Sequence, residues 1–290
     1  MSAVTTIDHG VWTERPASTS TAAVEALEAG DVLCFPKLAF SIEASELDLF
    51  SPAVSSAAKN VSFDSRTGRL RGAALDGPRA AALGALMSRF TGLASAFVGQ
   101  LLPRYGDRIE VGRTSFRPVE IAGRATSWRK DDTRLHIDCF PATPVHGRRI
   151  LRLFTNVNPA GHARTWRIGA EFEPLARRFA ARLRMPRPGT ASLLRLLRVT
   201  KSLRSPYDSL MLQLHDCMKA DAGYQTAAPQ TRFDFRPGTT WVAFTDQIPH
   251  AAMAGQYQLE QTFLLPVEAM IDERRSPLRI LERITGRRLT

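Results

Sequence analysis

The spacing of the apolar residues changes along the chain, and this change constrains the fold more than any other feature. Residues 77–102 carry Leu83, Phe90 and Phe97 at helical spacing, which predicts one long helix, or two with a break at Gly92. From residue 107 the spacing becomes two residues, in the stretches RIEVGRTSFRPVEI, TRLHIDCF and RRILRLFTNVN. Alternating runs that end in Pro or Gly are typical of an antiparallel sheet.

A helical stretch interrupts this sheet pattern. Residues 171–222 return to helical composition, and TRFDFRPG, TTWVAFTD and LEQTFLLPV then predict three more strands. Strands on both sides of the interruption need one another to cover their apolar faces. We therefore predict a single α+β domain over residues 1–290 with a mainly β core, a barrel or a sandwich. A helical insertion is expected at about 171–228, and a basic amphipathic helix at the C-terminus.

The N-terminal third is less regular. DVLCFPKLAF, residues 31–40, predicts a strand, whereas residues 41–76 are expected to form loops or a short helix with a turn at RTGRLRG.

The charge balance is basic, with 39 Lys and Arg against 28 Asp and Glu and a formal net charge of +11. Such a surface attracts phosphates on nucleic acid, anionic lipid or a small acidic substrate. Three widely spaced cysteines without CxxC spacing favour a reducing compartment and disfavour a zinc ribbon. No signal peptide and no membrane-spanning apolar run is recognised, so we expect a cytoplasmic protein whose membrane contact is peripheral.

One short pattern predicts a metal site. In TRLHIDCFP, His136 and Asp138 are two residues apart, so on a strand they share a face while Ile137 faces the core. His250, just after TTWVAFTD, could be brought beside them by sheet pairing. Two His and one carboxylate with open positions opposite are typical of non-haem Fe(II) oxygenases. The alternative for an isolated HxD pair is a His oriented by a carboxylate, or plain surface polarity.

Other histidines compete for the third position. His146 and His162 lie in Gly- and Pro-rich turns, and His215 lies on a predicted helix, where it could be a supporting or structural residue. We favour His250 because it stands between two predicted strands near the end of the sheet.

An oxygenase of this kind usually takes 2-oxoglutarate, whose distal carboxylate needs a basic partner. The Arg that many such enzymes place about ten residues beyond the last His is replaced here by Glu260, Gln261 and Thr262. Arg152, on the apolar strand RILRLFTNVNP, is our candidate anchor, because a buried guanidinium requires an anion. Its alternative partner is a protein carboxylate. Asn156, on the same face, and Gln261 and Thr262 are further candidates for hydrogen bonds to the co-substrate.

Most of the chain, from about residue 25 to 275, resembles the Kdo hydroxylases (Kdo dioxygenases) of Gram-negative bacteria. The segments that carry the resemblance are KNVSFDSRTGRLRG, RTSFRPVEIAGRATSWRKDDTRLHIDCFP, RILRLFTNVNP, LHDCMKADAGYQ and DQIPHAAMAGQYQLEQTFLLPVEAM. The resemblance implies a double-stranded β-helix (jelly roll) and an iron site formed by His136, Asp138 and His250. It also implies Fe(II), 2-oxoglutarate and O2 as cofactors.

The implied activity is hydroxylation at C3 of the outer Kdo sugar of Kdo2-lipid A, giving Ko, in lipopolysaccharide inner-core biosynthesis. The implied location is the cytoplasm, at the inner leaflet of the inner membrane. Kdo carries a carboxylate and lipid A carries phosphates, so we expect a basic cleft. The candidates for substrate binding are Arg117, Arg129, Lys130 and Arg134.

The helical insertion carries a second basic signal. SLLRLLRVTKSLRS mixes Leu and Arg at helical spacing, which is typical of a helix on an anionic membrane, or of one that packs on the barrel with its Arg side chains in water.

Two rival functions remain. One is an Fe(II)/2-oxoglutarate hydroxylase of another acidic substrate. The other is a basic nucleic-acid-binding protein, which we disfavour because no known binding motif is present and aromatics do not alternate with the basic patches. We expect no nucleic acid as a partner, and the sequence does not predict an oligomeric state.

Overall fold

Two sheets form the core of the protein in a computed structural model that describes residues 3–17, 20–56 and 60–290. In the larger sheet the order is β1-β2-β9-β6-β11-β5-β3-β4, and in the smaller one it is β10-β7-β8. Among the strands within these ranges, only β1 and β2 pair in parallel. The strands of the larger sheet are β1 (Val4–Thr6), β2 (Val32–Phe35), β9 (Thr240–Phe244), β6 (Arg149–Asn156), β11 (Gln258–Leu265), β5 (Glu110–Arg117), β3 (Val61–Asp64) and β4 (Arg69–Arg71). Those of the smaller sheet are β10 (His250–Ala254), β7 (Arg164–Gly169) and β8 (Gln230–Phe235).

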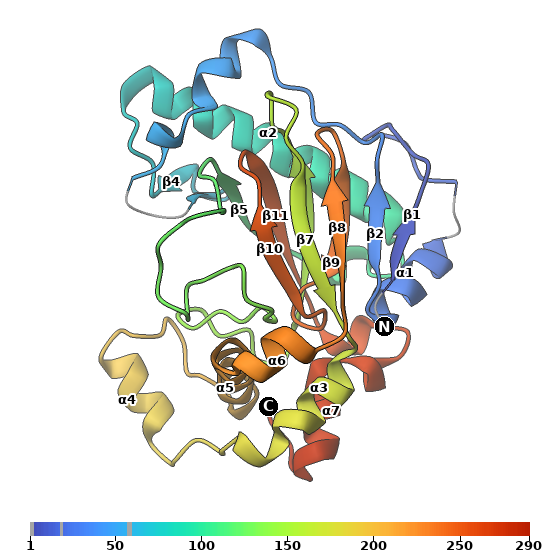
Figure 1. The fold of residues 1–290 in the computed structure, drawn as a ribbon, viewed down its shortest axis with the longest axis vertical. Coiled ribbons are helices and arrows are strands. Elements are labelled where there is room, and N and C mark those ends of the chain that lie inside the picture. Colours follow the sequence, from blue (N-terminus) through green and yellow to red (C-terminus); the bar gives the residue numbers. More distant parts are fainter. Residues whose placement is uncertain (1–2, 18–19, 57–59) are drawn as a thin grey trace.

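The smaller sheet lies in front of the larger one in Figure 1, and the helix α2 (Gly77–Leu101) crosses behind. An aromatic cluster fills the space between the sheets, where Phe154, Trp166 and Trp241 pack together. The opposite face of the larger sheet packs on α2 through residues such as Phe90 and Phe97. This two-sheet arrangement with flanking helices is the predicted jelly roll.

The helix α2 is unbroken, and Gly92 lies inside it. By length and apolar composition alone it could cross a membrane, but its buried face, which includes Leu83, Leu86 and Phe90, packs in the core.

The remaining helices lie mostly at one end of the molecule (Figure 1). Between β7 and β8, where the insertion was predicted, the chain forms α3 (Phe172–Phe179), α4 (Thr190–Leu196), α5 (Pro206–Ala220) and α6 (Ala222–Ala227). The predicted C-terminal helix is α7 (Pro277–Thr285), and α1 (Ser20–Ala29) precedes β2. Short 3₁₀ turns complete the set: η1 (Ala44–Leu49), η2 (Pro52–Val54), η3 (Gly106–Arg108), η4 (Ala180–Arg182), η5 (Val267–Ala269) and η6 (Glu273–Arg275).

Several strands depart from the sequence prediction. The turn at RTGRLRG joins two short strands, β3 and β4, in a region expected to be loop or helix. Strands β7 and β10 were not predicted, and HAAMA lacks alternation because four of its five residues are apolar. The segment TRLHIDCF was predicted as a strand but makes only one bridge, between His136 and His250. It is nevertheless extended enough to keep Ile137 in the core.

Candidate metal centre and the cleft beside it

Backbone pairing brings the two histidines together. The His136 N–H donates to the His250 carbonyl at 3.0 Å, and the His250 N–H donates back to the His136 carbonyl at 2.8 Å. Two residues on, the Asp138 N–H donates to the carbonyl of Thr245 at 2.8 Å. The segment that carries HxD is therefore held against both ends of the turn between β9 and β10, and the ligand spacing is set by main-chain bonds.

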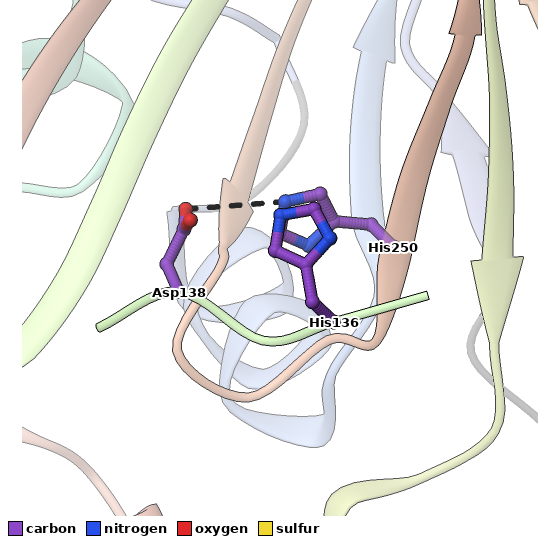
Figure 2. Close-up of side chains that lie close together, drawn as sticks. All are labelled: His136, Asp138 and His250. Atoms are coloured by element: carbon purple, nitrogen blue, oxygen red, sulfur yellow. Dashed lines mark ion pairs between the residues drawn. The ribbon is translucent and has the colours of Figure 1, made fainter. Parts of the chain in front are cut away.

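The three side chains converge (Figure 2). One potential ligand atom from each of His136, Asp138 and His250 lies within 4.8 Å of the other two. The Asp138 Oδ2 and His250 Nε2 atoms are 3.9 Å apart, and the two imidazole centroids are 4.7 Å apart. The predicted cluster is thus present, and both HxD side chains share a face as the two-residue period requires.

Each imidazole is oriented by its own backbone. The Nδ1 atom of His136 lies 2.7 Å from the carbonyl of Arg134, and that of His250 lies 2.8 Å from the carbonyl of Ile248. Because a carbonyl can only accept, each Nδ1 carries the proton and each neutral Nε2 offers a lone pair. Trp166 stacks on His250 with ring centroids 5.0 Å apart and fixes the plane of that ring.

The electrostatics favour the ligating protonation states. Burial lowers the pKa of His250, and burial together with the neighbouring His250 and Lys219 lowers the pKa of His136. Burial raises the pKa of Asp138, but Arg152 and the two imidazoles lower it more, so its net pKa is below the ordinary value. Neutral imidazoles beside an ionised carboxylate are the state that a divalent metal needs.

A carboxylate oxygen in the cluster that accepts no hydrogen bond also fits a metal site. Asp138 Oδ2 is buried and has no hydrogen-bond partner among the described residues. Its charge is offset by Arg152 Nε at 3.3 Å, but a buried carboxylate oxygen without a hydrogen bond still costs free energy, which a cation bound beside the two Nε2 atoms would lower. The set of two His and one Asp is the one that Fe(II) takes in this class of enzyme.

A buried guanidinium adjoins the cluster. The Arg152 Nε atom lies 3.3 Å from Asp138 Oδ2, and Arg152 Nη1 lies 3.0 Å from Glu260 Oε1. Glu260 also accepts from Arg117 Nε at 2.8 Å. Arg152 Nε is itself buried without a hydrogen-bond partner. The alternative weighed for Arg152, pairing with a protein carboxylate, is therefore present, with Asp138 at Nε and Glu260 at Nη1.

Arg152 lines a cleft of about 610 Å³. The cleft lies between one face of the larger sheet, at strands β3, β5, β11 and β6, and the loop at 140–145. Its basic lining consists of Arg66, Arg113, Arg117, Arg152 and Lys201. Glu260 and Thr262 also line it, and the metal cluster adjoins it through the contact between Arg152 and Asp138.

The four residues predicted to hold 2-oxoglutarate do not all reach this cleft. Thr262 pairs with Arg152 across β11 and β6, so both side chains lie on the sheet face that lines the cleft. Gln261 lies on the opposite face, where it bonds to Thr114 and to the Gly112 carbonyl, so it does not line the cleft, and its contact with 2-oxoglutarate stays a prediction that this placement disfavours. Adjacent strand residues face opposite ways, and only one of Gln261 and Thr262 could face the cleft.

Asn156 is on the face predicted for it, but its amide is occupied. It donates to the carbonyls of His162 and Phe235 and accepts from the Asn158 N–H. Phe154, which packs on the aromatic cluster, stands between it and Arg152. These bonds hold the turn that follows β6, and the contact of Asn156 with 2-oxoglutarate stays a prediction that they disfavour.

The four predicted substrate contacts separate into two groups. Arg117 lines the cleft. Arg129 pairs with Asp216 and lies over the ring of Trp128. Arg134 pairs with Asp131 and donates to the Lys219 carbonyl. Lys130 is exposed. These three lie outside the described cleft lining, and their contact with substrate stays a prediction.

Two supporting residues were not assigned from the sequence. Glu260 joins Arg117 to Arg152, and Trp166 stacks on His250. Glu260 occupies the position at which a basic residue was expected, and this anomaly was the available signal. His215, considered as a ligand, instead packs its ring edge-on to His136 with centroids 5.6 Å apart.

Comparison with known proteins decides the family. A family model described as 3-deoxy-D-manno-oct-2-ulosonic acid (Kdo) hydroxylase matches residues 11–288. The chain belongs to the Kdo hydroxylase family. It is 44% identical to KdoO, a non-heme Fe(II) α-ketoglutarate-dependent Kdo hydroxylase solved with α-ketoglutarate and Fe(III), with a TM-score of 0.96. The match covers 99% of this chain and 97% of KdoO.

A cobalt(II) complex of KdoO matches equally, at 45% identity, with the same TM-score and the same coverage of both chains. No protein of curated function matches the chain. The predicted family, jelly-roll fold and enzyme class are therefore confirmed, and Kdo hydroxylases include members that hold iron and α-ketoglutarate, the cofactors that we predicted.

Replacing Arg152 with Ala should weaken 2-oxoglutarate binding roughly 10- to 100-fold, because charged hydrogen bonds contribute about 1.5–3 kcal/mol. Calorimetric titration of the metal-loaded protein with 2-oxoglutarate measures this directly, and KM for 2-oxoglutarate should rise in parallel.

Arg152→Lys, which keeps the charge and loses the planar fork, should fall between the wild type and Arg152→Ala. An unchanged 2-oxoglutarate affinity in Arg152→Ala would place the anchor at another residue.

Proposed function

We propose that this Kdo hydroxylase adds one oxygen at C3 of the outer Kdo of Kdo2-lipid A, giving Ko, with Fe(II), 2-oxoglutarate and O2. The reaction balances as 2-oxoglutarate plus O2 plus a C–H bond, giving succinate, CO2 and a C–OH group. The observation that carries the proposal is the convergence of His136, Asp138 and His250 beside a cleft whose lining includes Arg152, the contact of Asp138.

His136, Asp138 and His250 would hold the iron. Ferrous iron and 2-oxoglutarate, when bound, supply the oxidising chemistry that a C–H bond of a sugar requires. The chain itself contributes orientation, because the backbone carbonyls of Arg134 and Ile248 keep both Nε2 atoms aimed inward. Arg152 would hold the co-substrate carboxylate beside Asp138, and Trp166 excludes water from one side of His250.

The cleft chemistry supports an acidic sugar as substrate. Five cations line it against three carboxylates, Asp64, Glu110 and Glu260, and each of these carboxylates is already paired with at least one guanidinium group. The net positive potential suits the carboxylate of Kdo and the phosphates of lipid A. Because the lipid is embedded in a bilayer, we further propose that the enzyme acts in the cytoplasm, at the inner leaflet of the inner membrane.

Mass spectrometry tests this function. Kdo2-lipid A incubated with the protein, Fe(II), 2-oxoglutarate and ascorbate should gain one oxygen, with equimolar succinate release. Lipid A without Kdo is the matched control and should gain none. Oxidation of a different acidic substrate, with Kdo2-lipid A unchanged, would contradict the proposal and favour the rival hydroxylase.

A further inference from the structure

The insertion carries an exposed apolar surface that the core does not use. Five large apolar side chains in residues 193–203 are between 44% and 78% exposed. These are Leu193, Leu196, Leu197, Val199 and Leu203. They account for five of the nine such side chains in the described parts of the chain. A concentration of this kind marks an interaction surface, whereas single exposed leucines do not.

Cations surround these side chains. Residues 187–204, which we call the basic tip, contain Arg187, Arg195, Arg198, Lys201 and Arg204, and no Asp or Glu occurs between Glu173 and Asp208. Arg195 and Arg198 are exposed and have no carboxylate partner within the described ranges. The partner of such a surface must offer both apolar volume and negative charge, which excludes a neutral or basic protein face.

The basic tip is fixed to the rim of the cleft. The Lys201 N–H donates to the Ala142 carbonyl at 2.9 Å, and Arg204 Nη2 donates to the Pro141 carbonyl at 2.6 Å. Lys201, Pro141 and Ala142 all line the cleft. In Figure 1, α4 projects at the lower left, away from both sheets. The exposed leucines therefore lie next to the mouth of the cleft, on an element that protrudes from the fold.

We propose that the basic tip docks on a bilayer that contains anionic phospholipid, with its leucines inserted among the headgroups. Insertion of apolar side chains and attraction of the flanking cations act together in such binding. The role of this docking, which is to hold the cleft mouth against a lipid-linked Kdo, rests on the proposed function. The docking itself requires neither iron nor Kdo.

Vesicle sedimentation tests the docking with the full chain. The wild type should bind vesicles of phosphatidylcholine and phosphatidylglycerol, and bind pure phosphatidylcholine at least about tenfold more weakly. The variant Leu196→Asp/Leu197→Asp should lose about tenfold or more in affinity for the anionic vesicles. Leu47→Asp is the matched control, because Leu47 is 52% exposed on η1, far along the chain, and should bind as the wild type does.

Tryptophan fluorescence measures insertion of the tip into the bilayer without introducing a charge. Tryptophan placed at Leu196 should shift its emission to shorter wavelength on mixing with anionic vesicles, and tryptophan at Leu47 should not. Both aspartate variants should unfold at the wild-type temperature, which excludes a folding defect.

Two results would overturn the proposal. The first is equal vesicle binding by Leu196→Asp/Leu197→Asp and the wild type. The second is a wild-type dimer that this variant converts to monomer in light scattering, which would make the tip a self-association surface. Turnover of Kdo2-lipid A dispersed in detergent, measured on the wild type, tests the proposed function separately, since no bilayer is present there.

Discussion

Replacing Asp138 with Ala should abolish hydroxylation and remove tight binding of Co(II) or Fe(II). Asp138 is the only carboxylate in the metal cluster found among the described residues, and its loss leaves two neutral imidazoles. The change also removes the anion between Arg152 and the cluster, so the charge of Arg152, still paired with Glu260 on its other side, opposes a divalent cation there. Metal titration followed by the visible absorption of Co(II) measures binding, and succinate release measures turnover.

His162→Ala is the control for this experiment. His162 is exposed and outside the cluster, and only its backbone carbonyl holds Asn156, so its side chain should be dispensable. Retention of full Co(II) affinity in Asp138→Ala, with His162→Ala behaving as the wild type, would contradict the assigned ligand set.

Replacing Asp246 with Ala should lower the free energy of unfolding by about 3–5 kcal/mol, the usual cost of leaving a buried charge unpaired. Asp246 accepts two hydrogen bonds from Arg149, and both side chains are essentially inaccessible to solvent. Arg149 also donates to Gln247 and lies over the ring of Phe244, so it has no route to water. Urea unfolding of the metal-free protein measures the loss.

Two further variants identify the cause. Asp8→Ala, which breaks an exposed pair with Lys37, should change stability little. Arg149→Met/Asp246→Ala should recover part of the loss, because it removes the unpaired charge as well. Unchanged stability of Asp246→Ala would show that water or another group reaches Arg149.

The sequence predicts two of the three metal-site residues from local spacing alone. The two-residue period of a strand was sufficient to place His136 and Asp138 on one face and Ile137 in the core. The choice of His250 relied on its position after a predicted strand. The bridge that joins it to His136 is a long-range pairing, which local spacing does not encode.

The co-substrate residues show the limit of such reasoning. Gln261 and Thr262 are adjacent, so strand alternation alone required one of them to face away, and the register of β11 against β6 selected Thr262. That register is a tertiary property. Glu260 was noticed as a departure, but its pairing with Arg117 and Arg152 depends on three strands meeting in one sheet.

In the fold, too, local spacing predicts some elements and tertiary pairing determines others. Long periodic elements such as α2 and β6 were predictable because their apolar residues repeat over several turns or steps. The strand β10, which consists mostly of Ala, becomes a strand because β7 lies beside it. Its own residues have low strand propensity.

The bridge between His136 and His250 has a consequence for synthesis. The two histidines are separated in the sequence by the helical insertion between β7 and β8. A nascent chain on the ribosome therefore contains His136 and Asp138 for a long interval before His250, the third ligand, has been made. A partial donor set holds metal weakly. Loading with iron must therefore wait until His250 has been translated, and a product terminated before that residue would be released without its metal.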